Sequence, residues 1–600
     1  MTWRETRRLI REDHARKLAS DKRPDRWTCR VALVLSTSAM AVLIYRLAAY
    51  FYSNNLYFFT KILSVLNIVL FNVEISPRAQ IDGGFVLGHA QGVTVHDRSK
   101  VGRNCTLMHH SSIGVKLPEG EDSGGPLAEL EDDILVGAGA RIMGCRIRIG
   151  AGCRIGPNAV VLKSMPPGQV VLGIPATAVR PYDPVGEQCA ESYIERAPGK
   201  DEEICRIGLL RTFSLIRADV AAKARVEGRV PGVWTWCCLA FDPAVLAVVV
   251  FRFQSWLYHL GLRPVAKVLS YLNTVLFTVE IGSTACIGKG LVLRSAQGIL
   301  VNRCSRIGEN CILSPRVTLF IGPRKGMNPL TDRVVLGDNV YIGTGARVGG
   351  NIRIGNNCIL GANTVVTFDV AENSVMAGVP GRPLATWTAA QQEQARNPGP
   401  CAGLVPWSRV GFVRTIRLIR QDIGMRAKIE GKRANAFYWL KLLLNPPGLA
   451  VINYRLQVWL YGLRLYPFSG LLRFVNMVFF KVDISPRTRF GGGFILAHAN
   501  GIVIGDHVEI GENCILHLAS TLATGPRRNS SPEADRLVLG DNALIGAGAM
   551  LIGNIVLGDN VVVGLNSVVV ADAPDNAVLV GVPARLVANS KQEESLGEAR

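Results

Sequence analysis

Residues 335–366 read VLGDNVYIGTGARVGGNIRIGNNCILGANTVV, and an aliphatic side chain returns at every sixth position of this stretch. The returning residues, most of them followed by glycine, are Leu336, Ile342, Val348, Ile354, Leu360 and Val366. An amphipathic helix has a period near 3.6 and a half-buried strand a period of two, so neither explains a period of six. This repeat is typical of a left-handed parallel β-helix, whose coils have three short faces with the aliphatic residue inside and glycine or asparagine at the corners.

The chain carries this repeat in three copies. A phrase written VLGHAQGV at 86–93 returns as VLRSAQGI at 292–299 and as ILAHANGI at 495–502, at intervals of 206 and 203 residues. Each copy also opens with a basic helical phrase and closes with a GVP-like phrase; these are LIRED (9–13), LIRAD (215–219) and LIRQD (418–422), and GIPAT, GVPGR and GVPAR. The chain is therefore a tandem triplication, which predicts three copies of one structural unit.

We predict a mainly β protein in which three left-handed parallel β-helix prisms, each preceded by a helical subdomain, form an intramolecular pseudo-trimer within a monomeric chain. The predicted helical segments are 1–70, 205–276 and 409–479, and the β-helices are 71–180, 277–385 and 480–588. Connectors rich in Pro, Gly, Gln and Glu lie at 181–204 and 386–408, and a tail follows at 589–600.

The amino-acid composition limits the classes of partner that we expect this chain to bind. A formal charge of +20 indicates an anionic partner, either a phosphate-bearing ligand or a membrane surface. Nucleic acid is disfavoured because no helix-turn-helix or aromatic-basic pattern accompanies the charge. The apolar helical stretches are shorter than the about 20 residues needed to span a bilayer, so they are buried or interfacial. We expect a cytoplasmic protein, and leave open contact with the inner face of the membrane or with a polysaccharide-synthesis complex.

The cysteines show no metal-site pattern. Cys105, Cys311 and Cys514 hold equivalent positions inside apolar segments, and no C-x-x-C occurs. We therefore interpret these three as buried small side chains and expect no metal site.

The repeated phrase contains the candidate general bases. Two copies place a histidine in it, His89 and His498, whereas the middle copy has Ser295. A carboxylate stands fifteen residues upstream each time, at Glu74, Asp483 and Glu280. Fifteen residues is close to one eighteen-residue coil, which suggests that each carboxylate meets the histidine of its own copy and fixes its tautomer. Serine is no base at neutral pH, so we expect Ser295 and Glu280 to mark a degenerate site.

These phrases resemble the hexapeptide-repeat acyltransferases, and specifically their serine acetyltransferase branch. The resemblance covers most of all three copies, and its most specific elements are YRL-x-x-WLY, VDISP, HA-x-G, IGAGA and GVPAR. It implies an acetyl-CoA-dependent enzyme built from three parallel prisms, with active sites between neighbours. It also implies a catalytic His–Asp dyad, which we assign to His89 with Glu74 and to His498 with Asp483.

The resemblance further implies how substrates bind. It suggests pantetheine contacts from backbone amides around Gly137, Gly139, Gly343, Gly345, Gly546 and Gly548. Arg382 and Arg585 are expected to hold CoA phosphates, while the first copy has Thr177 at that position. Arg333 and Arg536 remain from an acceptor-binding loop that has lost its histidine. His109, His110 and His517 we interpret as polar lining.

The acceptor site departs from the family pattern. The aspartate that the family places directly before the catalytic histidine is replaced by Gly88, Arg294 and Ala497. Because these changes remove groups that would bind an amino acid, we favour O-acetylation of a sugar or glycan hydroxyl in exopolysaccharide biosynthesis. The alternatives are serine O-acetylation for cysteine biosynthesis and a non-catalytic scaffold in a polysaccharide machine.

Overall fold

The computed structural model describes residues 1–20, 36–115, 128–144, 146–179, 208–227, 242–320, 333–386, 411–431, 438, 445–524 and 536–589. Within these ranges the predicted β-helices are confirmed: each copy forms one left-handed prism with sheets of five, four and six strands on its three faces. Most of the connectors at 181–204 and 386–408, and of the tail, lie outside the described residues.

Consecutive strands of each prism pass to the next face in turn, so that each sheet collects every third strand, except that the last two strands of each prism both join the six-stranded sheet. The strands of prism 1, sheet by sheet, are β1 Glu74–Ile75, β4 Thr94–Val95, β7 Ser112–Val115, β10 Arg141–Met143 and β13 Val160–Val161; β2 Gln80–Ile81, β5 Ser99–Val101, β8 Ala128–Leu130 and β11 Ile147–Ile149; and β3 Val86–Leu87, β6 Thr106–Leu107, β9 Leu135–Val136, β12 Arg154–Ile155, β14 Val170–Leu172 and β15 Thr177–Val179.

Prism 2 repeats this arrangement. Its strands are β16 Val279–Ile281, β19 Ile299–Val301, β22 Thr318–Phe320, β25 Arg347–Gly349 and β28 Val365–Val366; β17 Cys286–Ile287, β20 Arg306–Ile307, β23 Val334–Leu336 and β26 Ile352–Ile354; and β18 Val292–Leu293, β21 Ile312–Leu313, β24 Tyr341–Ile342, β27 Ile359–Leu360, β29 Ser374–Ala377 and β30 Arg382–Thr386.

Prism 3 has the same arrangement of strands. Its strands are β31 Val482–Ile484, β34 Ile502–Ile504, β37 Thr521–Ala523, β40 Met550–Ile552 and β43 Val568–Val569; β32 Arg489–Phe490, β35 Val508–Ile510, β38 Leu537–Leu539 and β41 Val556–Leu557; and β33 Ile495–Leu496, β36 Ile515–Leu516, β39 Leu544–Ile545, β42 Val562–Val563, β44 Ala577–Gly581 and β45 Ala584–Asn589.

The six-residue period fills the interior of each prism. Ile307, Leu336 and Ile354 stack in parallel register on one face of prism 2, and all three are buried. Each such side chain contributes about 1.5–3 kcal/mol relative to an exposed one. Cys105, Cys311 and Cys514 are buried in the same interiors, and burial raises the pKa of the Cys311 thiol to about 12. These thiols therefore act as small apolar side chains.

Three helices cover the first coil of each prism. They are α1 Trp3–Ser20, α3 Thr37–Ser53 and α4 Tyr57–Phe71; α6 Leu209–Val226, α8 Pro243–His259 and α9 Arg263–Phe277; and α11 Phe412–Ile429, α13 Pro446–Gly462 and α14 Tyr466–Phe480. The aspartate of the opening LIRED-like phrase pairs with a buried arginine of the second helix in every copy: Asp13 with Arg46 at 2.8 Å, Asp219 with Arg252 at 2.9 Å and Asp422 with Arg455 at 2.9 Å. The same arginines donate to carbonyls of the prism, such as Ile81 O. These pairs thus attach the helices to the coils.

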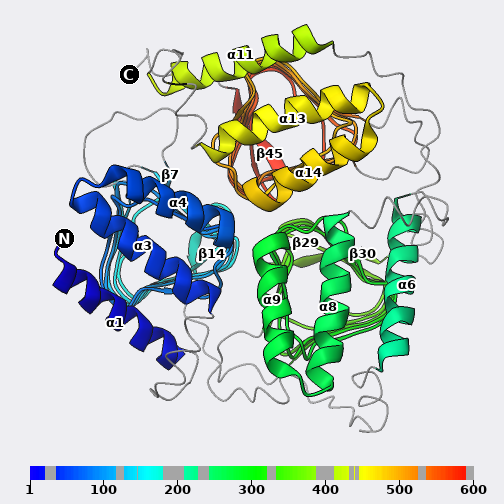
Figure 1. Ribbon diagram of the computed structural model, residues 1–600, viewed down its shortest axis with the longest axis horizontal. Coiled ribbons are helices and arrows are strands. Elements are labelled where there is room, and N and C mark those ends of the chain that lie inside the picture. Colours follow the sequence, from blue (N-terminus) through cyan, green and yellow to red (C-terminus); the bar gives the residue numbers. More distant parts are fainter. Residues whose placement is uncertain are drawn as a thin grey trace.

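The three prisms stand side by side around a common axis with their helices at one end (Figure 1), where α4, α9 and α14 contact one another. Three asparagines close this arrangement. The Nδ2 group of Asn158 donates to Gly345 O and Asn363 O at 3.0 and 3.1 Å, that of Asn363 to Gly548 O and Asn566 O at 3.2 and 2.9 Å, and that of Asn566 to Gly139 O and Asn158 O at 2.9 and 3.1 Å. The ring joins the prisms in the cyclic order 1, 2 and 3.

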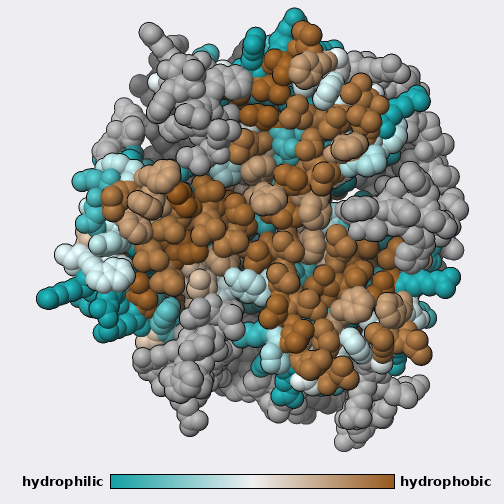
Figure 2. Space-filling model, viewed as in Figure 1, coloured by the Kyte–Doolittle hydropathy of each residue, from teal (hydrophilic) through white to brown (hydrophobic). Residues whose placement is uncertain are grey.

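The helical end of the molecule is an apolar surface. Figure 2 shows hydrophobic side chains over the paired helices of all three copies and hydrophilic ones toward the rim. The exposed apolar residues include Phe58 and Phe59 of α4, Val268 of α9, and Phe468 and Leu471 of α14. Among the described helices, none has both the length and the apolar character required to cross a bilayer.

Candidate active site

Each of the three prism interfaces brings the repeated phrase of one copy against a carboxylate of the next. His89 Nδ1 lies 3.1 Å from Glu280 Oε2, and His498 Nδ1 lies 2.9 Å from Glu74 Oε2. At the third interface the Ser295 hydroxyl donates to Asp483 Oδ2 at 2.6 Å. The three interfaces therefore hold two histidine–carboxylate pairs and one serine–carboxylate pair, each formed between two prisms.

The predicted pairing within one copy is wrong. Glu74 binds His498 rather than His89, and Asp483 binds Ser295 rather than His498. The physical reason is the length of the first coil, in which Glu74 stacks on Thr94, twenty residues later, along a flat face. His89 lies five residues before that partner, between β3 and β4, at a corner of the prism that meets Glu280 of prism 2. Glu280 thus belongs to a complete pair, and Asp483 is the carboxylate without a histidine.

The charges of the complete pairs suit a base and its orienting acid. Burial disfavours the charged form of His498, but Glu74 outweighs it and raises the pKa of the imidazole. Burial raises the pKa of the two carboxyl groups. His498 nevertheless holds the pKa of Glu74 below its usual value, and His89 does the same for the pKa of Glu280. An ionised carboxylate only accepts, so each Nδ1–H donates to it and Nε2 is left as the basic nitrogen.

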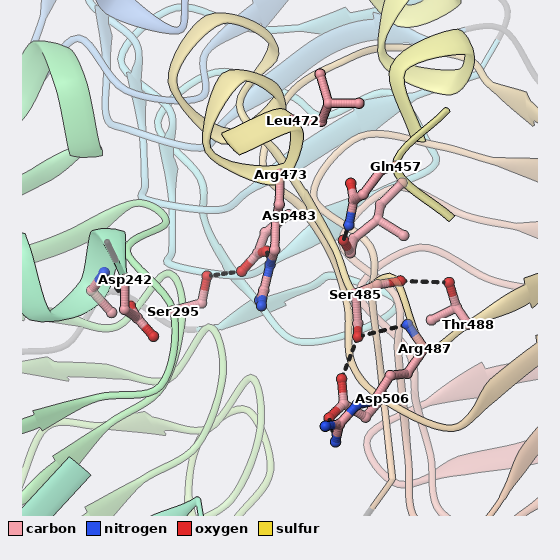
Figure 3. A network of polar contacts seen from close by, with 12 residues as sticks. Asp242, Ser295, Gln457, Leu472, Arg473, Asp483, Ser485, Arg487, Thr488 and Asp506 are labelled. Atoms are coloured by element: carbon pink, nitrogen blue, oxygen red, sulfur yellow. Dashed lines mark hydrogen bonds and ion pairs between the residues drawn. The ribbon is translucent and has the colours of Figure 1, made fainter. Parts of the chain in front are cut away.

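The third interface replaces the histidine by an ion pair (Figure 3). Arg473 Nε lies 2.7 Å from Asp483 Oδ1, opposite the oxygen that accepts from Ser295. Burial would raise the pKa of Asp483, but Arg473 and the Ser295 hydrogen bond bring it below the usual value. The equivalent positions of α4 and α9 hold Ser64 and Ser270. Sequence reasoning missed Arg473, although the third copy alone has arginine where the other two copies have serine, which was a visible signal.

A cation of the first helix supports the repeated phrase in copies 2 and 3. The Nη1 group of Arg426 donates to Leu496 O at 3.0 Å, and Lys223 Nζ donates to Leu293 O at 3.0 Å. Lys17 holds the same position in copy 1. Burial raises the pKa of Glu280, and the charge of Lys17 adds to the larger effect of His89 in lowering it. These residues were also missed, although each stands four positions after the repeated aspartate of the LIRED-like phrase.

The glycines predicted to bind pantetheine do not offer free amides. All six are buried, and each N–H already donates to a carbonyl; the residues are Gly137, Gly139, Gly343, Gly345, Gly546 and Gly548. Gly139, for example, donates to His109 O, and its own carbonyl accepts from Asn566. The Gly139 corner of the coil faces the neighbouring prism, and the pantetheine contacts predicted around these glycines stay a prediction.

The predicted arginines lie at the surface. Arg382 is the first residue of β30 and Arg585 the second of β45, the last strands of their prisms. Both are exposed, as is Thr177 in prism 1. Arg333 donates its backbone N–H to Asn351 Oδ1 at 3.2 Å, and Arg536 lies 3.8 Å from Glu509. None of these contacts joins the arginines to His89 or His498, so their roles in binding stay predictions.

The remaining histidines of the loop lie next to the pairs, His109 and His110 buried and His517 half-buried. His109 packs edge-on against His89 with ring centroids 5.7 Å apart, and its Nε2 lies 2.8 Å from Thr318 Oγ1 of prism 2. His110 Nε2 lies 3.3 Å from Gly298 O. Burial, with a smaller effect of His498, lowers the pKa of His517 to about 4. A neutral imidazole at these positions fits polar lining.

Family models match two segments of the chain. Residues 333–367 match the bacterial transferase hexapeptide (six repeats), and residues 536–571 match the hexapeptide repeat of succinyl-transferase. With the coiled fold and the interprism histidines, these matches define a hexapeptide-repeat acyltransferase.

The similar proteins narrow the class. The serine acetyltransferase of Helicobacter pylori strain J99 is 31% identical over 172 residues, which is 29% of this chain and 92% of that protein. That of Synechococcus elongatus is 34% identical over 25% of this chain and 61% of its own length, so the chain spans less than two thirds of this relative. The crystal structure of Neisseria gonorrhoeae serine acetyltransferase is 31% identical with a TM-score of 0.27, covering 30% of this chain and 68% of that one. The chain belongs to the serine acetyltransferase family.

Pairing across prisms predicts a specific pattern of double mutants. His89→Ala and Glu280→Ala should each disable the same histidine–carboxylate centre. The double variant should therefore lose no more turnover than the worse of the two single variants. His89→Ala with Glu74→Ala should disable both centres and lower turnover by about 10²–10⁴-fold, the usual contribution of a general base. Steady-state rates of acetyl transfer check this. If His89→Ala with Glu74→Ala behaved as a single change, pairing within one copy would be right.

The third interface should become a histidine–carboxylate centre when its two differing residues are replaced by those of the other copies. Ser295→His with Arg473→Ser recreates the residues of the other two copies opposite Asp483. In a His89→Ala, His498→Ala background, this double change should bring back acetyl transfer, whereas Arg473→Ser alone should not, because it supplies no base. Release of CoA measures the outcome. A rate as low as that of the background would show that more than these two residues separates the third interface from a centre.

Proposed function

We propose that this chain is an acetyl-CoA-dependent O-acetyltransferase with two catalytic centres, His89–Glu280 and His498–Glu74. The observation that carries the proposal is the contact of each histidine Nδ1 with an ionised carboxylate of the next prism. It fixes the tautomer in which Nε2 is free to take a proton. Both side chains of each pair remain partly exposed, at 35% and 32% for the first and 24% and 35% for the second, so a substrate can reach them.

The transfer follows from this arrangement. Nε2 removes the proton of the acceptor hydroxyl as its oxygen attacks the thioester carbonyl, and the carboxylate stabilises the imidazolium that forms. Collapse of the tetrahedral intermediate breaks the C–S bond, and the imidazolium returns its proton to the CoA thiolate. The products are the acetyl ester and CoA. At the third interface Ser295 offers no comparable base, so that site is inactive.

Acetyl-CoA would lie in the groove between neighbouring prisms. The exposed Arg382 and Arg585 are suited to its phosphates because guanidinium groups bind phosphate oxygens in a bidentate manner. Buried glycine amides contribute nothing to this binding. Side chains at the prism surface, rather than the coil corners, would therefore determine affinity for the cosubstrate.

Two acceptor classes are supported by different observations. Relatives named serine acetyltransferases favour L-serine. The residues before the two histidines, Gly88 and Ala497, favour a sugar or glycan hydroxyl, because neither carries a carboxylate to bind an ammonium group. In either case Arg333 and Arg536 would contact the acceptor or its anionic substituents. We propose a hydroxyl acceptor of polysaccharide biosynthesis first and L-serine second.

The single chain would work as a monomer whose three prisms replace a trimer, resting on an anionic membrane surface. Its helical end exposes apolar side chains of α4, α9 and α14, and α1 and α11 carry exposed arginines, among them Arg7, Arg11, Arg414 and Arg417. An apolar face with basic residues beside it is the composition that binds the interface of an anionic bilayer. Such a position would give access to lipid-linked glycans.

Acceptor-dependent release of CoA from acetyl-CoA tests the function. We expect turnover with sugars or oligosaccharides above that with L-serine, and loss of turnover in the His89→Ala, His498→Ala protein while its thermal unfolding is unchanged. Turnover with serine alone would make serine the acceptor. Unchanged turnover in the double variant would refute the assignment of both centres, and acetyl-CoA binding without turnover on any acceptor would favour a scaffold.

Cosedimentation with vesicles tests the membrane contact. Binding to phosphatidylglycerol vesicles should exceed binding to phosphatidylcholine vesicles and weaken with salt. Each arginine near an anionic surface contributes about 1 kcal/mol, so Arg414→Glu with Arg417→Glu should weaken binding more than about tenfold. Leu162→Ser, which removes an exposed apolar side chain of prism 1, is the matched control and should have no effect. Equal binding to both lipids would contradict the proposal.

A further inference from the structure

The axis between the prisms contains three buried arginines. Arg141, Arg316 and Arg347 are 1%, 3% and 2% exposed. Each reaches from its own prism to another: Arg347 Nη1 lies 3.2 Å from His109 Nε2, Arg316 Nη2 donates to Thr521 Oγ1 at 3.1 Å, and Arg141 Nε lies 3.5 Å from Asn566 Oδ1. The cluster thus sits where all three prisms meet, next to the asparagine ring.

These arginines have no counter-charge. In the described part of the chain, no ion pair joins any of the three guanidinium groups to a carboxylate, whereas the equally buried Arg46, Arg252 and Arg455 each have an aspartate. Burial lowers the pKa of Arg141 and Arg347 to about 9. The pKa of Arg316 is lowered by burial and by repulsion from the other two guanidinium groups. Arginine nevertheless stays charged near neutral pH, and an uncompensated buried charge costs several kcal/mol.

Unpartnered donors surround the same cluster. Arg316 Nε is buried without a hydrogen-bond partner. The side-chain amides of Gln91 and Gln297, which hold equivalent positions one coil closer to the helices, lack partners at both the donor Nε2 and the acceptor Oε1. His109 accepts from Arg347 at Nε2, which places its proton on Nδ1, and that nitrogen also has no partner. Buried polar groups are normally satisfied, so several orphaned donors beside three cations indicate a missing acceptor.

We propose that the axis holds a small inorganic anion, chloride in ordinary buffers, bound by Arg316 and Arg347 and by the donors around them. The side chains that would bind it are almost fully buried, so the ligand is enclosed when the prisms assemble and must be small. The third copy contributes no cation here: Ala519 stands at the position of Arg316, and Met550 at that of Arg141 and Arg347. The anion compensates the charge that copies 1 and 2 bring to the axis.

Bromide provides a direct probe of occupancy. Crystals grown in sodium bromide and measured at the bromine absorption edge should show an anomalous peak on the axis, within hydrogen-bonding distance of Arg316. A map whose anomalous peaks all lie at the protein surface, with only water density on the axis, would overturn the proposal. The experiment uses the unmodified chain and does not depend on any variant folding.

Thermal unfolding tests binding in solution. At constant ionic strength, exchange of sodium methanesulfonate for sodium chloride should raise the Tm, and each further tenfold increase in chloride above half-saturation should raise it by the same increment. Constant ionic strength removes the general screening effect of salt. Arg316→Ala with Arg347→Met installs the residues that the third copy already uses, and it should abolish this dependence. The surface variant Arg353→Met should retain it.

Each outcome of the unfolding experiment either supports or contradicts the bound anion. A Tm that is independent of chloride in the unmodified chain would contradict the proposal, as would a dependence that survives in the Arg316→Ala, Arg347→Met protein. If that variant failed to fold in any buffer, recovery of its folding by the further change Arg141→Met, which removes the last guanidinium, would still attribute the defect to uncompensated charge. Failure to recover, together with an empty axis in the bromide map, would refute it.

Discussion

Closure of three prisms around one axis is the constraint on which the rest of the structure depends. Asn158, Asn363 and Asn566 each donate to two carbonyls of the next prism, which closes the ring in the cyclic order 1, 2, 3. That order decides which carboxylate meets which histidine, because neither centre is complete within one prism. Coil packing makes each prism stable, but docking of neighbours makes the centres.

Carrying all three prisms on one chain removes a restriction that symmetry would impose. In a trimer of identical chains, a residue on the axis occurs three times, and a buried arginine there would bring three charges in one layer. Here the layer of Arg141 and Arg347 is completed by Met550, and that of His110 and Arg316 by Ala519. The copies can therefore differ at their interfaces while the coils, which depend on the six-residue period, remain alike.

The prisms could be predicted from the sequence because their interior follows a pattern that is local in the chain, with an inward aliphatic residue at every sixth position. It did not predict the pairing, since a spacing of fifteen residues suggests neighbouring coils of one prism, whereas Glu74 stacks on Thr94 and the histidine turns to the next prism. Spacing along a chain contains no information about which corner faces a neighbour. For the same reason it did not show that the glycine N–H groups are already bonded within the coil, although Asn158, Asn363 and Asn566, repeated at equivalent positions, were a readable sign of the interface.

The third interface shows what a buried carboxylate requires. Loss of the histidine alone would have left Asp483 enclosed between prisms without a partner, at a cost of several kcal/mol. Ser295 and Arg473 together supply a hydrogen bond and a charge, on opposite oxygens of the carboxylate. The interface therefore demands a partner for the carboxylate, and a base is only one way to provide it. It follows that a retained Asp or Glu at this position does not identify a centre, and that the imidazole opposite it does.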